Sequence, residues 1–228
     1  MKIYGLQKMT LLDYPGRIAC TVFLSGCDMR CPWCHNSELA EGKAPAVMTS
    51  EELISFLKKR QGMLEGVAVT GGEPLLREES LELLREIRAL GYPVKLDSNG
   101  THPDRLRRAA EEGLIQYCAM DIKNSPERYA ETAGLSEIAL TAVRESVDFL
   151  KTGSIDYEFR TTAVKELHDE QSFRAIAEWI SGAKRYAIQK FTDRDTVPFE
   201  GFHAPEEAQI QAWAEIVRPH VRELLIRG

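Results

Sequence analysis

The sequence has 228 residues, of which 43% are hydrophobic and 28% are charged, proportions that are ordinary for a folded globular protein. This composition excludes a disordered chain, a collagen and a small disulfide scaffold. No apolar run approaches the roughly 18–20 residues that a membrane-crossing helix needs, and the first residues lack the apolar stretch of a signal peptide. The net charge of −6 offers nothing to a nucleic-acid backbone or an anionic membrane. We therefore expect a cytoplasmic protein with no nucleic-acid and no membrane partner.

Strand and helix patterns alternate along the whole chain. Apolar and β-branched runs predict strands at 18–24, 66–70, 94–98, 117–122, 157–164 and 186–191, and a short edge strand at 221–226. Residues with helical spacing lie between these runs and predict six helices. The first is capped by Thr49 or Ser50, the second covers 76–90 and ends at Gly91, and the third starts at Pro103. The others are Glu137–Leu150, Phe173–Ile180 and a last helix with Pro205 in its first turn.

Six strand–helix units without a Pro/Gly/Ser-rich linker predict an α/β fold with a largely parallel sheet, in a single domain over residues 1–228. A closed barrel of eight units typically takes about 250 residues. An open, incomplete (βα)6 barrel therefore fits the strand count better. In such sheets the chemistry collects at the carboxyl ends of the strands.

Three of the five cysteines lie within eight residues, in a loop at 25–36 that follows the first predicted strand. These are Cys27, Cys31 and Cys34, in the sequence CDMRCPWC. A loop has little core to bury three such side chains, so they are expected to bind something. Cys20 and Cys118 lie in apolar stretches, where a free cysteine usually packs as a small buried side chain.

Sulfur-rich sites select zinc or an iron–sulfur cluster. Structural zinc takes four ligands, and His35 could be the fourth, but adjacent Cys34 and His35 would have difficulty pointing at one tetrahedral ion. A ferredoxin cluster needs four cysteines, and only three are gathered here. The interpretation that remains is a 4Fe-4S cluster held by three cysteines, with one iron open to a group that is not protein.

Polar residues end the predicted strands. The second strand ends in Thr70-Gly71-Gly72-Glu73-Pro74. The glycines permit close approach of the backbone to a ligand, and Glu73 can meet an ammonium group. An ordinary strand-to-helix turn also explains the segment. The third ends in Asp97-Ser98-Asn99-Gly100, which by itself is typical of a turn. Charged residues in apolar strands need a partner or a ligand, which makes Asp121, Lys123 and Arg160 candidates. A buried ion pair among them is the alternative.

The motif CDMRCPWC just past a first strand resembles the radical S-adenosylmethionine (SAM) family. That resemblance implies an oxidoreductase whose open iron chelates SAM and whose cluster supplies one electron to cleave it to a 5′-deoxyadenosyl radical. It also implies that Gly71-Gly72-Glu73 binds the methionine amino group, that Ser98 and Asn99 lie near the ribose, and that Trp33 shields the cluster. The further predicted cofactor-binding residues are His35, Asp121, Lys123 and Arg160.

A narrower resemblance is carried by LLDYPG at 11–16, by FLSGC at 23–27 and by Cys34-His35-Asn36. These segments resemble the activating enzymes of glycyl radical enzymes, and most nearly that of anaerobic ribonucleoside-triphosphate reductase. The resemblance implies that the radical takes hydrogen from a glycine of this large partner, with flavodoxin or ferredoxin as the reductant. Related activating enzymes bind a monovalent cation, and the matching positions here are Asp97, Ser98 and Asp121.

Two other functions stay open at this point. A radical enzyme could act on a small molecule such as a deazapurine precursor, or the chain could be a non-catalytic zinc or electron-transfer module. An activating enzyme needs an open mouth that admits a glycine-bearing loop, and Thr192–His203 is predicted as a mobile rim loop. The histidines other than His35 are expected at the surface or as helix caps, although His168 could face the site.

Overall fold

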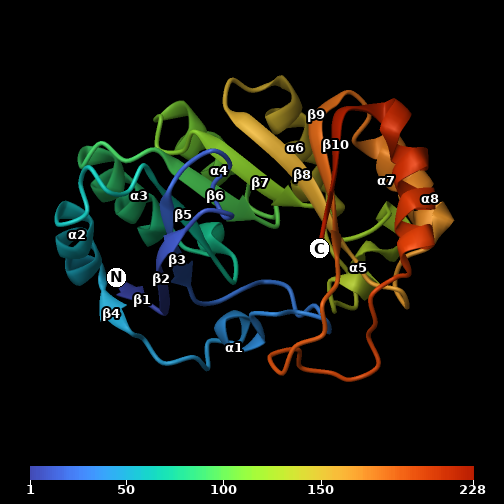
Figure 1. The fold of residues 1–228 in the computed structure, drawn as a ribbon, viewed down its shortest axis with the longest axis horizontal. Helices are drawn as coiled ribbons and strands as arrows, with labels where there is room; N and C mark the ends of the chain where they lie inside the picture. The colour runs from blue at the N-terminus through green and yellow to red at the C-terminus, as the bar shows by residue number, and fades with distance from the viewer.

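The computed structural model describes residues 1–228, and its main feature is one eight-stranded sheet in the order β10-β9-β8-β7-β6-β5-β3-β2 (Figure 1). The strands are β2 (Gly5–Thr10), β3 (Ala19–Leu24), β5 (Gly66–Gly71), β6 (Val94–Ser98), β7 (Tyr117–Asp121), β8 (Asp156–Ala163), β9 (Ala183–Lys190) and β10 (Val221–Arg227). All neighbours from β3 to β10 are parallel, and β2 is antiparallel to β3. Because β2 and β10 are unpaired edges, the barrel does not close, which confirms the predicted incomplete α/β barrel.

Helices connect successive strands and cover the outer face of the sheet (Figure 1). They are α2 (Ser50–Lys58), α3 (Glu79–Ala89), α4 (Pro103–Glu111), α6 (Leu140–Thr152), α7 (Glu170–Trp179) and α8 (Glu207–Val217), with two short helices, α1 (Ser37–Ala40) and α5 (Tyr129–Thr132). The predicted starts at Thr49 and Pro103 are confirmed, since Thr49 caps α2 in a capping box with Glu52. None of the helices combines the length and apolar character required to span a bilayer.

Two local expectations are wrong, and two small elements were not predicted. The helix expected from Glu137 begins at Leu140, and Pro205 precedes the cap residue Glu206, so it lies outside the first turn of α8. The edge strand β2 was not predicted, because most of its side chains are exposed or half-buried and no alternating apolar pattern marks it. A small antiparallel pair, β1 (Lys2–Ile3) with β4 (Met48–Thr49), was not predicted either.

The amino end of the barrel is closed by Tyr14, which lies in the loop between β2 and β3. Its buried ring lies 6.3 Å from the ring of Tyr117, centroid to centroid, and a Cβ on Gly66 would lie only 2.9 Å from it. Tyr117 and Gly66 are the first residues of β7 and β5. The free space of the barrel is therefore at its carboxyl end, as the parallel sheet predicts.

Candidate functional site

A cavity of about 440 Å³ lies at the carboxyl ends of the strands. With the single exception of Glu73, every site residue predicted from the sequence lines it: Cys27, Cys31, Trp33, Cys34, His35, Gly71, Gly72, Asp97, Ser98, Asn99, Asp121, Lys123 and Arg160. Sequence reasoning missed several others, among them Gln7, Asp13, Thr21, Gln189 and Arg194. Thr21 and Gln189 lie on predicted strands, and period-two alternation could have identified them.

The loop at 25–36, called here the cysteine loop, is held in place by backbone hydrogen bonds from both sides. Cys27 N donates to Ala40 O, at the end of α1, at 3.1 Å, and Arg30 N donates to Ala133 O, just past α5, at 2.8 Å. Trp33 Nε1 donates to Thr132 O at 3.1 Å. The loop therefore has a defined shape without any regular secondary structure of its own.

All three clustered thiols line this cavity. Burial raises the pKa of Cys27 to about 12 and that of Cys31 to about 11, so each favours the neutral thiol unless a metal binds it. Cys20 and Cys118 are fully buried and do not line the cavity, as the packing interpretation predicts. Three soft sulfur donors in a common cavity fit an iron–sulfur cluster.

A zinc site with His35 as fourth ligand fits the geometry less well. His35 Nε2 lies 2.6 Å from the carbonyl oxygen of Thr192, and the imidazole stacks on Phe191. No three of the side chains that ligate metals converge as they would around a single ion. The histidine thus connects the cysteine loop to the segment that follows β9.

Gly71 and Gly72 lie where the end of β5 runs beside the end of β3 and the start of the cysteine loop. A Cβ would lie 2.0 Å from Leu24 O at Gly71 and 2.1 Å from Gly26 O at Gly72. Asn36 Nδ2 donates to Gly71 O at 3.1 Å and closes the same contact. Glycine is required here because two backbones touch, a reason additional to the predicted approach of a ligand.

Glu73 has a different position from the one expected of a ligand-binding carboxylate. It is 2% exposed and accepts hydrogen bonds from Leu75 N (2.9 Å), Asn99 N (2.7 Å) and Ser98 Oγ (3.1 Å). Burial raises the pKa of Glu73 to about 7. These hydrogen bonds hold Ser98 and Asn99 in place at the end of β6. Glu73 does not line the cavity, and its contact with a ligand ammonium group stays a prediction.

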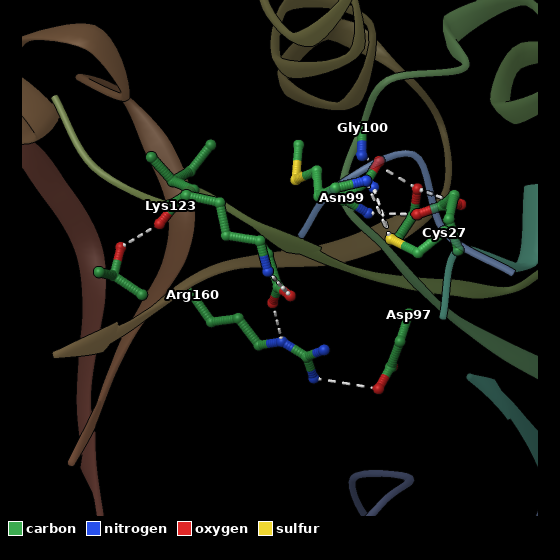
Figure 2. Close-up of polar contacts among 12 residues, drawn as sticks. Cys27, Asp97, Asn99, Gly100, Lys123 and Arg160 are labelled. Carbon is green, nitrogen blue, oxygen red and sulfur yellow. Dashed lines mark hydrogen bonds and ion pairs between the residues drawn. The ribbon is translucent and has the colours of Figure 1, made fainter. Parts of the chain in front are cut away.

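The charged residues at the strand ends form one partly buried network (Figure 2). Arg160 contacts Asp97, with Nη1 to Oδ2 at 3.1 Å, and also pairs with Asp121. Lys95 pairs with Asp97, and Lys123 Nζ lies 2.8 Å from Asp121 Oδ2. Burial opposes ionisation of Asp121, but the adjacent Arg160 and Lys123 cations outweigh it and hold the pKa of that carboxyl far below its usual value. The ion pairs are thus present, and contact of Asp121, Lys123 and Arg160 with SAM stays a prediction.

The same network bears on the predicted monovalent cation. The carboxylates of Asp97 and Asp121 each contact two basic side chains. Cation binding at Asp97, Ser98 and Asp121 stays a prediction, and it would compete with these pairs. Lys123 Nζ also lies 5.3 Å from the centre of the Trp33 ring, which links the network to the cysteine loop.

His168 is neither on the surface nor in the cavity lining. It is 3% exposed, its Nε2 lies 2.9 Å from Lys123 O, and its Nδ1 accepts from Val164 N at 3.1 Å. The expected surface or capping role is wrong for this residue. Its imidazole joins the ends of β7 and β8 behind the charged network.

The region from β3 to just past α7 matches a known protein family. The model of the Radical SAM superfamily matches residues 21–180, which include the cysteine loop and the strand ends around the cavity. The chain belongs to the radical SAM superfamily. Membership implies a 4Fe-4S cluster and SAM as cofactors, and the three cysteines that line the cavity of this radical SAM protein fit the cluster.

The relatives of this radical SAM protein are named as different enzymes. A protein of Methanocaldococcus jannaschii, provisionally named a glycyl-radical enzyme activating enzyme, is 31% identical over 235 residues, covering 99% of this chain and 95% of its own. A 7-carboxy-7-deazaguanine synthase of Halobacterium salinarum is 25% identical over 215 residues, covering 92% and 82%. Streptococcus suis SuiB, solved with its precursor peptide SuiA, superposes with a TM-score of 0.72 at 12% identity, over 91% of this chain and 48% of that one. Such low identity shows the fold alone, and this chain spans about half the length of SuiB.

Proposed function

We propose that this radical SAM enzyme activates a glycyl radical enzyme by taking a hydrogen atom from a glycine of that partner. The observation that carries the proposal is the unclosed sheet. The cavity is lined by Gln7 of the edge strand β2, by Gln189 of β9, which is paired with the other edge, and by Arg194 beyond it. A gap between two edges admits a loop of another protein, whereas a closed barrel of eight units would be filled by its own side chains.

In this proposal Cys27, Cys31 and Cys34 hold the cluster, which supplies the electron for reductive cleavage of SAM when both are bound. The other residues of the chain bind and orient. Gly71 and Gly72 give the cofactor a surface of bare backbone, and the ring of Trp33 excludes water from one side. Glu73 accepts hydrogen bonds from Ser98 and Asn99, and it thereby keeps the polar groups of these two residues in a constant position.

The partner we propose is an anaerobic ribonucleoside-triphosphate reductase. Support comes from the segments LLDYPG and Cys34-His35-Asn36 and from the relative that aligns over nearly the whole chain. All five cysteines are free, which favours a reducing compartment such as the cytoplasm, where such a partner would be found.

A small-molecule reaction is the second candidate, because a 7-carboxy-7-deazaguanine synthase aligns over 92% of the chain. The cavity volume of about 440 Å³ also lies within the range of roughly 300–1,000 Å³ that is usual for small-molecule sites. In that case the cavity would hold the substrate beside SAM and no partner protein would be needed.

One experiment separates the two candidates. The protein is reconstituted anaerobically, reduced with dithionite, supplied with SAM and incubated with the reductase or, in parallel, with a deazapurine precursor. We expect the doublet EPR signal of a glycyl radical on the reductase, and no signal with Cys31→Ala in place of the wild type. Conversion of the deazapurine precursor without any glycyl radical would overturn the proposed activation.

A further inference from the structure

One carboxylate of the cysteine loop has no part in the roles described so far. Asp28 directly follows the first cluster cysteine, does not line the cavity and has a side chain that is 29% exposed. Its nitrogen and oxygen donors all come from the turn between β6 and α4. Asn99 Nδ2 donates to Asp28 Oδ1 at 2.7 Å. Thr101 Oγ1 donates to Asp28 Oδ2, and His102 Nε2 lies 3.3 Å from the same oxygen. Asp28 therefore ties the cysteine loop to the residues that follow β6.

We infer that Asp28 is a positioning residue that holds the side-chain amide of Asn99 against the sulfur of Cys27, and that this hydrogen bond raises the reduction potential of the cluster. Hydrogen bonds to ligand sulfurs are among the features that set the potential of an iron–sulfur cluster, because they stabilise the added negative charge of the reduced state. The inference rests on the cluster that Cys27 holds in the proposed function. It is independent of the substrate that the radical attacks.

The contact between the amide and the sulfur is direct. Asn99 Nδ2 lies 3.8 Å from Cys27 Sγ, within hydrogen-bond distance for the larger sulfur atom, and Met29 N donates to the same sulfur at 3.4 Å. Figure 2 shows the side chain of Asn99 lying against Cys27. Asn99 is only 6% exposed, so little water competes for this contact. Two protein donors thus reach the sulfur of the first cluster cysteine.

The orientation of the Asn99 amide is fixed by its other partners. Thr101 N donates to Asn99 Oδ1 at 3.0 Å. Because a backbone N–H can only donate, the atom that faces it is the oxygen, and the NH2 group points the other way. The two hydrogens of that group are then directed to Asp28 and to Cys27. The backbone is held as well, since Asn99 N donates to the buried Glu73 at 2.7 Å.

Asp28 has two effects on the cluster, and they differ in sign. Its Oδ1 lies 3.8 Å from Cys27 Sγ, and a negative charge so close to a ligand sulfur opposes reduction. The amide that it orients favours reduction. Glu73 and Lys123 also act on Cys27 through their charges, and they stay the same when Asp28 is changed. A measured potential can therefore separate a positioning role of Asp28 from a purely electrostatic one.

The test compares two substitutions of Asp28 that remove the same charge. Asp28→Asn keeps an oxygen that can accept a hydrogen bond from Asn99 Nδ2, whereas Asp28→Ala leaves the amide without this acceptor. The potential of the reconstituted cluster is measured by a redox titration with dithionite and mediators, followed by EPR, without SAM and without any partner protein. Iron and sulfide per chain are measured on every sample.

We expect the cluster of Asp28→Ala to be harder to reduce than that of Asp28→Asn. At one applied potential, the ratio of reduced to oxidised cluster should be lower by roughly three- to tenfold, the range that one hydrogen bond of ordinary strength gives. A tenfold ratio corresponds to about 59 mV for one electron. Asn99→Ala should lower the ratio relative to the wild type to a similar extent. When Asn99→Ala is already present, the two Asp28 substitutions should give equal potentials, because no amide is left to orient.

Equal potentials for Asp28→Ala and Asp28→Asn in the otherwise unchanged chain would overturn the inference, since Asp28 would then act through its charge alone. A potential of Asn99→Ala at or above that of the wild type would contradict the hydrogen bond to the sulfur. Loss of the cluster from Asp28→Ala or from Asn99→Ala would also refute the inference, because that residue would then be required for assembly. The proposed function is judged separately, by the glycyl radical formed with dithionite.

Discussion

Replacing Gly72 with alanine tests whether the contact between β5 and the cysteine loop controls cluster assembly. A Cβ at Gly72 would lie 2.1 Å from Gly26 O and 3.3 Å from the Cβ of Cys27. Real Cβ atoms essentially never approach another atom within 3.0 Å, so the two backbones have to separate by about 0.9 Å. That movement displaces the residue directly before the first cluster cysteine.

The cost follows from the contacts that change. Overpacking of a rigid site costs about 1–3 kcal/mol. The hydrogen bond from Glu73 N to Gly26 O, 2.8 Å long, is stretched as well, which removes about 0.5–1.5 kcal/mol. We therefore expect Gly72→Ala to lower the free energy of unfolding by about 2–4 kcal/mol and to reduce the iron bound after reconstitution.

The free energy of unfolding is measured by denaturant titration of the metal-free protein, and iron and sulfide per chain are measured after anaerobic reconstitution. Gly42→Ala is the matched control, because Gly42 has a φ of 75° but no atom within 4 Å of an added Cβ. It should lose only about 1–2 kcal/mol from the left-handed backbone and keep its iron. If Gly72→Ala retained full stability and full iron content, the steric reasoning would be refuted.

Three other predictions concern the cysteines, a buried histidine and the last strand. Cys27→Ala should lose the iron–sulfur absorbance, whereas Cys118→Ala, changed within the core of β7, should keep it. Burial lowers the pKa of His168 below the usual 6.5, so below about pH 6.5 the unfolded chain binds a proton that the folded chain does not. Denaturant titrations should therefore show the free energy of unfolding decreasing as the pH is lowered through that range. His168→Gln should reduce this dependence on pH. Arg227 makes two hydrogen bonds, of 2.8 and 2.7 Å, to Glu158, which is 1% exposed. Arg227→Met should lower the free energy of unfolding by about 2–3 kcal/mol, after allowance for the partial exposure of the arginine. Adding Glu158→Gln to this variant should recover part of the loss. If the losses of the two substitutions were fully additive, the pairing would be contradicted.

Much of the architecture could be predicted from the sequence, because strands buried on both faces leave continuous apolar runs and amphipathic helices leave a regular period. The cysteine loop could be predicted for a similar reason, since three thiols at short spacing have few explanations. The strand β2 could not, because an edge strand with exposed side chains resembles a loop in composition. The start of α6 was misplaced because no capping side chain precedes Leu140.

The sequence by itself predicted many of the residues that line the cavity, and only the tertiary structure decided what each of them touches. The partner of a charged strand residue depends on register, and Asp121 meets Arg160 because those two residues lie opposite each other on β7 and β8. Glu73 is held by the end of β6, and Thr192 lies 157 residues beyond His35 along the chain, yet at hydrogen-bond distance from it. Local patterns arise from the short-range geometry of one element. Contacts between elements depend on how the whole sheet curves and on which loops meet at its carboxyl end.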